Sequence, residues 1–156
     1  MSDVLNRPRA EAVLAEAGVD VVVCTTHANV FYLTGYIGFV QRLMPTTQVY
    51  AVARAEALDA PVLIAPIGDL DMQAQFPARF DRIRQYGSFF VEGAERAAGG
   101  SGEEARYGAL ALEQPEADPT EVLLDELARL PARARVAIDE RGIAAAALAA
   151  VQQRFG

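Results

Sequence analysis

The sequence is poor in the residues that build most catalytic and metal sites. It has one cysteine, Cys24, one histidine, His27, and no tryptophan. A lone cysteine excludes a disulfide within the chain, which favours a reducing, cytoplasmic location. Zinc sites need several converging His, Cys or carboxylate ligands. We therefore expect neither a metal site nor catalytic residues in this chain.

Positive charge is also scarce. All 14 basic residues are arginine, the acidic residues number 21, and the net charge is −7. Nucleic-acid binding needs a basic surface, so this balance argues against nucleic acid as a partner. The N-terminus has no apolar signal core, and the most apolar stretch, residues 19–26, is too short to span a bilayer. We expect no membrane partner either.

What the sequence does have is an alternation of helix and strand patterns. Apolar spacing predicts a helix over 7–17 that ends at Gly18, and a run of valines predicts a strand over 19–24 buried on both faces. Asp118 before Pro119 predicts a capped helix, which Pro131 ends. Further strands are expected at 48–53, at 62–65 before Pro66, at 80–86 and at 135–139. Short helices are expected at 27–35 and 69–76, a helix from Glu103 and a final helix from Ile143. Residues 38–46 would form a loop or the approach to a strand, and residues 97–102 a flexible stretch.

This order predicts one α/β domain over residues 1–156, in which a mixed sheet lies between two layers of helices. The strands at 48–53 and 62–65 would form an antiparallel hairpin, and the strand at 80–86 would lie at an edge. A chain of 156 residues with 52% hydrophobic residues can bury a core without a disulfide or metal.

Three groups of residues are candidates for chemistry. Cys24 and His27 have the spacing of a weakly specific thiol–imidazole pair, although a cysteine in a valine-rich strand is usually a core residue. Paired carboxylates are expected to be solvated or to cap helices; they are Asp69/Asp71, Glu103/Glu104, Asp125/Glu126 and Asp139/Glu140. The glycines at 35–38 and 99–102 lack the context of a phosphate-binding loop.

The segment around Gly35 is rich in aromatic residues. Phe31, Tyr32, Tyr36 and Phe39 follow one another at short intervals. Such clusters are usually core, but the glycines here leave room for Tyr36 or Phe39 to face a substrate. Arg42, in the same segment, is either a surface residue or a bidentate partner for a carboxylate.

Residues 29–35, Asn-Val-Phe-Tyr-Leu-Thr-Gly, resemble the Asn-x-x-Tyr-Leu-Ser/Thr-Gly signature of the creatinase/prolidase N-terminal domain. Its matching positions are Asn29, Tyr32, Leu33, Thr34 and Gly35, to which we assign a structural role. The Gly-Val-Asp strand before it and the Arg-Val-Ala-Ile-Asp strand at 135–139 also match, and the resemblance covers nearly the whole chain. It is weakest over 92–115.

The resemblance implies a ribonuclease H-like three-layer fold and an accessory role in a creatinase/prolidase-like hydrolase, such as an Xaa-Pro dipeptidase or aminopeptidase or another C–N hydrolase. Catalysis would belong to a pita-bread domain that is absent here, with two divalent metal ions in the peptidase members. Partners would be that domain and, in a homodimer, a second subunit. Phe39 and Arg42 are our candidates for residues that contact, in trans, the substrate in the active site of the second subunit. Alternatives are a stand-alone interaction or small-ligand-binding module, and a small hydrolase that uses Cys24 and His27.

Overall fold

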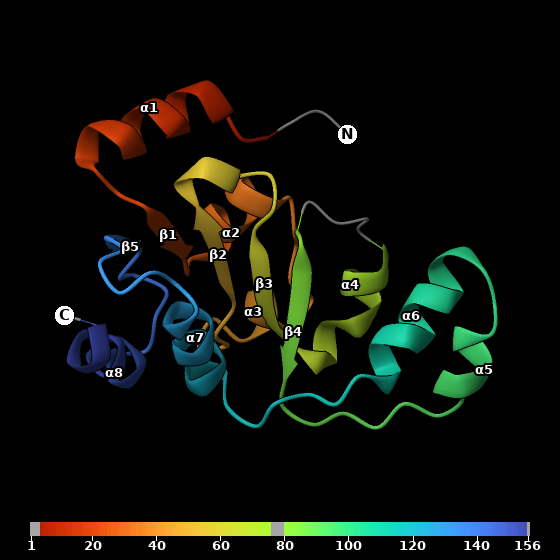
Figure 1. Cartoon of the computed structure of the whole chain (residues 1–156). Coiled ribbons are helices and arrows are strands. Elements are labelled where there is room, and N and C mark those ends of the chain that lie inside the picture. Colours follow the sequence, from red (N-terminus) through yellow and green to blue (C-terminus); the bar gives the residue numbers. More distant parts are fainter. Residues whose placement is uncertain (1–3, 76–79, 156) are drawn as a thin grey trace.

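In the computed structural model, which describes residues 4–75 and 80–155, five strands form one mixed sheet with helices on both faces (Figure 1). The strand order is β4-β3-β2-β1-β5. β2 is antiparallel to both neighbours, whereas β1 pairs parallel with β5 and β3 pairs parallel with β4. The strands β1, β3, β4 and β5 therefore run in the same direction, and their carboxyl ends lie at one end of the sheet. The strands are β1 (Val21–Cys24), β2 (Tyr50–Arg54), β3 (Val62–Pro66), β4 (Arg82–Tyr86) and β5 (Val136–Ile138).

The helices pack in two layers, and a pair of them, α5 and α6, lies beside α4 at the β4 side of the molecule (Figure 1). None of the described helices has the length and apolar content needed to cross a bilayer. The helices are α1 (Arg7–Ala17), α2 (His27–Thr34), α3 (Phe39–Leu43), α4 (Leu70–Gln75), α5 (Ala94–Ala98), α6 (Gly102–Leu112), α7 (Pro119–Ala128) and α8 (Ala145–Phe155), with 3₁₀ turns η1 (Ala55–Ala57) and η2 (Ile67–Asp69).

Each face of the sheet has its own apolar core. Successive side chains of a strand point to opposite faces, so Val21 and Val23 lie on the α7/α8 face while Cys24 lies on the other. The first core includes Val21, Val23, Tyr50, Val52, Ile64, Val122, Leu123, Leu127, Ala147 and Val151. The second includes Leu5, Cys24, Val30, Leu33, Tyr36, Val49, Ala51, Ala53, Leu63 and Ala65.

Local sequence signals account for most of these elements. Asn6 caps α1 by accepting a hydrogen bond from the Arg9 amide, and Gly18 ends it with φ of 60°. The Asp118 carboxylate accepts hydrogen bonds from the amides of Thr120 and Glu121 at 2.7 and 3.2 Å, as predicted for the cap of α7. The β2–β3 hairpin, the edge position of β4 and the three-layer α/β class are confirmed.

Three predictions about single elements are wrong. Residues 39–43 form the helix α3 rather than a loop or the approach to a strand, and part of the stretch expected to be flexible, 97–98, lies in α5. Pro66 does not stop β3 but is its last residue, paired with Tyr86. The helix expected at 69–76 begins at Leu70, and Phe76 lies outside the described residues. In the first case a contact with a distant segment, the hydrogen bond from the Val40 amide to Asp69, decides the structure rather than a local signal.

Candidate functional site

Polar side chains gather at the carboxyl ends of the parallel strands. Thr25 and Thr26 follow β1, Asp69 follows β3 and Asp139 follows β5. Ligands of open α/β sheets usually bind at this end. Here, however, the polar groups are largely bonded to one another, so the cluster acts first as a scaffold.

The Asp139 carboxylate joins the end of β5 to the start of α2. Its Oδ2 accepts hydrogen bonds from the Thr26 amide at 3.1 Å, the Thr26 hydroxyl at 2.6 Å and the Asn29 side-chain amide at 2.6 Å. Partial burial alone would raise the pKa of Asp139, but these hydrogen bonds prevail and lower it below its ordinary value. The expectation of an ordinary solvated carboxylate is wrong for Asp139, because its partners come from the other end of the sequence.

The loop after Asp139 packs directly on the backbone that follows β1. The Thr25 hydroxyl donates to the Asp139 carbonyl oxygen and accepts from the Gly142 amide at 3.1 Å. A Cβ at Gly142 would lie 2.4 Å from the carbonyl carbon and oxygen of Thr25. Only glycine allows this approach, which fixes the position of the Asp139 loop relative to α2.

The signature residues occupy α2 and its C-terminus. Leu33 is buried in the core, and the Thr34 hydroxyl donates to the Val30 carbonyl oxygen at 2.6 Å and accepts from the Tyr36 amide at 3.0 Å. Gly35 ends the helix with φ of 73°, a left-handed conformation that favours glycine. Tyr32 is 42% exposed, and its hydroxyl accepts a hydrogen bond from the Asn6 amide at 3.1 Å.

Tyr36 and Asp69 form a buried pair immediately after the signature. The Tyr36 hydroxyl donates to Oδ2 of Asp69 at 3.0 Å, and Oδ1 accepts from the Val40 amide at 2.8 Å. Burial raises the pKa of Asp69 despite these two hydrogen bonds, and it also raises the pKa of the Tyr36 phenol. Tyr36 is therefore a core residue, and the alternative that it faces a substrate is wrong. Asp69 is not a solvated carboxylate at the start of a helix, as expected, but is fully buried.

The helix α3 presents an exposed surface made of Phe39, Arg42, Leu43 and Met44, which we call the α3 surface. The side chains of Phe39, Leu43 and Met44 are 56%, 65% and 55% exposed. Phe39 and Arg42 are three residues apart in one helix and so lie on neighbouring positions of its surface. No ion pair within the described residues involves Arg42. Gln41 faces inward, where its amide donates to the Thr25 carbonyl oxygen at 3.3 Å.

The Cys24–His27 pair has the wrong properties for a nucleophile. Burial, together with the negative charge of Asp139, raises the pKa of the Cys24 thiol to about 12. A catalytic cysteine needs the opposite shift, since the thiolate is the reactive form. In residues 4–75 and 80–155, no three His, Cys, Asp or Glu side chains are grouped closely enough to hold a metal ion.

The carboxylates Asp125 and Glu126 form ion pairs with strand β4. Arg84 contacts Asp125 at 2.7 Å and Glu126 at 3.4 Å, and it also pairs with Glu116. Arg82 contacts Glu126 at 2.6 Å. Glu126 is buried, so the expectation that this pair lies on a solvated face is wrong for Glu126. The network fastens α7 to the edge strand and leaves no carboxylate pair there for catalysis.

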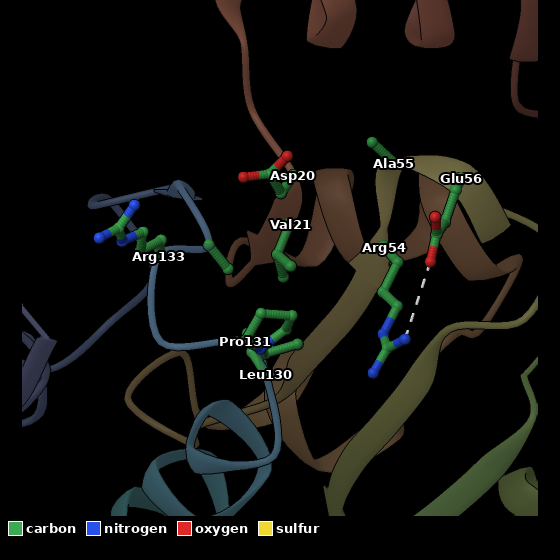
Figure 2. A pocket seen from close by; sticks show the side chains of 9 residues that line it. Asp20, Val21, Arg54, Ala55, Glu56, Leu130, Pro131 and Arg133 are labelled. Carbon is green, nitrogen blue, oxygen red and sulfur yellow. Dashed lines mark ion pairs between the residues drawn. The ribbon is translucent and has the colours of Figure 1, made fainter.

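A shallow pocket of about 340 Å³ lies at the opposite end of the sheet (Figure 2). It is formed by the start of β1, the end of β2 and the segment before β5. Arg54 pairs with Glu56 at 3.7 Å on one side of the pocket. Asp20 accepts a hydrogen bond from the Arg135 amide at 2.8 Å. The described residues that line the pocket include no histidine, cysteine, serine or threonine.

Reasoning from the sequence missed the tertiary roles of Asp69, Asp139 and Gln41. A signal was present for the first two, because each acidic residue follows the carboxyl end of a predicted strand. Nothing in the spacing of Gln41 indicates that it is buried, since its segment was not expected to be helical. The structure places Phe39 and Arg42 together on the exposed side of one helix.

Comparison with protein families supplies one match. The family model described as the creatinase/prolidase N-terminal domain matches residues 7–156. No curated protein matches the sequence. The matched range includes every helix and strand described above.

Proposed function

The chain belongs to the creatinase/prolidase N-terminal domain family, and from that premise we propose that it is a non-catalytic accessory domain of a creatinase/prolidase-like hydrolase. The chemistry belongs to a pita-bread domain that cleaves an Xaa-Pro peptide bond or a related C–N bond. Any divalent metal ions are held by that domain. The accessory domain contributes to a cytoplasmic homodimer and covers the active site of the neighbouring subunit.

The observation that supports this proposal is the α3 surface. Three large apolar side chains of one short segment are more than half exposed, while the same segment is held by the Val40 amide, which donates to Asp69, and by the buried side chain of Gln41. Clusters of exposed apolar side chains commonly mark surfaces that bind another molecule. A fixed helix with such side chains suits a surface that closes over a site rather than one that performs chemistry.

Phe39 and Arg42 would have different roles in such a contact. The Phe39 ring can exclude water from an apolar part of a bound substrate. The Arg42 guanidinium can pair with a carboxylate through two parallel hydrogen bonds. Their common helix would let one subunit supply both groups to a substrate held by its partner.

The test is a kinetic comparison in the full-length enzyme that carries this domain. We expect Phe39→Ala and Arg42→Ala each to lower kcat/KM about tenfold or more, as removal of a central contact residue usually does. Phe90→Ala and Arg106→Ala are matched controls, since both residues are exposed and lie outside the α3 surface. The controls should leave kcat/KM unchanged.

Unchanged specificity constants in both Phe39→Ala and Arg42→Ala would contradict a role of this surface in trans. Equal losses in variants and controls would point to a general effect on folding. Mixed dimers sharpen the result: a subunit with an inactive catalytic domain and an intact α3 surface should restore activity to a partner that carries Phe39→Ala.

A further inference from the structure

The helix α3 begins without a capping side chain of its own. The first amides of a helix have no partner within the helix, and a Ser, Thr, Asp or Asn at the preceding position usually accepts from one of them. Here that position is Gly38, which makes no side-chain hydrogen bond. A five-residue helix that starts on glycine has little stability by itself.

Asp69 supplies the missing acceptor from a different part of the chain. Its Oδ1 accepts from the Val40 amide at 2.8 Å, and Val40 is the second residue of the helix. This is the hydrogen bond that a capping residue at position 38 would make. We propose that Asp69 is the positioning residue of the α3 surface, a tertiary cap that holds α3 and sets the direction of Phe39 and Arg42.

The contacts around Asp69 restrict its carboxylate to a single position. The residue is fully buried, and its second oxygen is held by the Tyr36 hydroxyl at 3.0 Å. A Cβ at Gly38 would lie 3.1 Å from both Oδ2 of Asp69 and the Tyr36 ring. Glycine at position 38 thus makes room for the carboxylate that replaces its missing side chain.

Behind Asp69, a second set of buried hydrogen bonds fastens the segment that carries it. The side-chain amide of Gln73 donates to the Pro66 carbonyl oxygen at 2.9 Å, and that of Gln85 donates to Gln73 at 2.7 Å. These bonds tie α4 to the end of β3 and to β4. The cap of α3 is therefore anchored in the sheet rather than in a surface loop.

This inference rests on the proposed function in one respect only: that function gives the direction of α3 its importance. The cap itself is tested on the chain of residues 1–156 by amide hydrogen exchange, followed by NMR, in three variants. Asp69→Ala removes both acceptors, Asp69→Asn keeps one oxygen for the Val40 amide, and Asp71→Asn removes the charge of an exposed carboxylate two residues away.

We expect the Val40 amide to exchange about tenfold faster in Asp69→Ala, measured relative to the amides of β2 and β3, because its acceptor is lost. Asp69→Asn should restore most of the protection, and Asp71→Asn should match the wild type. Equal acceleration of Val40 and the sheet amides, or an unchanged Val40 amide, would overturn the proposal. Neither outcome depends on whether Phe39 touches a substrate, so the cap and the proposed function can fail separately.

Discussion

The signature segment, residues 29–35, and the α3 surface are neighbours in sequence and similar in composition, yet they are buried to very different degrees. Leu33 is 5% exposed and Leu43 is 65% exposed, although both lie in short helices. The signature helix turns its apolar side toward the sheet, whereas α3 turns Phe39 and Leu43 outward. One apolar segment is therefore part of the core of the domain, whereas the next leaves its large apolar side chains exposed.

The two segments also differ in how they are held. Asn29 and Thr34 bind through their own side chains, to Asp139 and to backbone groups near Gly35. The helix α3 is held through its backbone and through Gln41, so its other side chains contribute little to holding it in place. Removing a side chain should therefore have different consequences in the two segments: a large loss of stability in the first and little loss of stability in the second.

The largest effect should come from the loop that supports the signature segment. In Gly142→Ala the new methyl group would collide with the Thr25 backbone at 2.4 Å, and the atoms that it meets belong to the backbone rather than to the end of a flexible side chain. We expect a loss of about 4 kcal/mol or more in the free energy of unfolding, measured by urea denaturation.

Gly99→Ala is the matched control for this substitution. The nearest atoms to a Cβ there lie at 3.5 and 3.8 Å, and φ is −78°. It should change stability by less than about 0.5 kcal/mol. If Gly142→Ala proved as stable as Gly99→Ala, the packing of the Asp139 loop on Thr25 would be disproved.

The variants Leu33→Ala and Leu43→Ala test the difference in burial between the two segments directly. The first leaves a cavity in the core and should cost about 3 kcal/mol. The second removes a mostly exposed side chain and should change the free energy of unfolding by less than about 0.5 kcal/mol. Both are measured by urea denaturation at neutral pH. Similar losses in the two variants would mean that the α3 surface belongs to the core.

The smallest effect is the pH dependence of the bond between Asn29 and Asp139. Because hydrogen bonds prevail over burial and hold the pKa of Asp139 below its ordinary value of 3.8, the ionised form stabilises the fold. That contribution is complete above the ordinary value and is lost as the pH falls through the lower pKa of the folded state. We expect Asp139→Asn to cost about 1 kcal/mol at pH 7.

The difference between wild type and Asp139→Asn should then shrink at pH values below about 4, as the wild-type carboxyl becomes protonated. Glu140→Gln removes the charge of the exposed neighbour and should show no such convergence. A difference that stayed constant from pH 7 to the lowest pH at which the chain still folds would contradict the role of the ionised carboxylate.

Much of the fold could be predicted because its signals are local. Asp118 with Pro119 starts a helix, Gly18 and Gly35 end helices, and the valines of β1 indicate a strand covered on both faces. The signature segment was also found from residue type and spacing. The helix at 39–43 was missed because its cap comes from Asp69, which no local pattern connects to Gly38.

The sequence by itself determined the layer order, the family and the scarcity of catalytic groups, because periodicity, turn residues and composition do not depend on distant contacts. Only the tertiary structure decided which polar residues are buried and which apolar residues are exposed. Asp69 found a hydrogen-bond donor and Glu126 an arginine on a remote element, which is the condition for burying a carboxylate. Phe39 and Leu43 remained on the outside, 56% and 65% exposed.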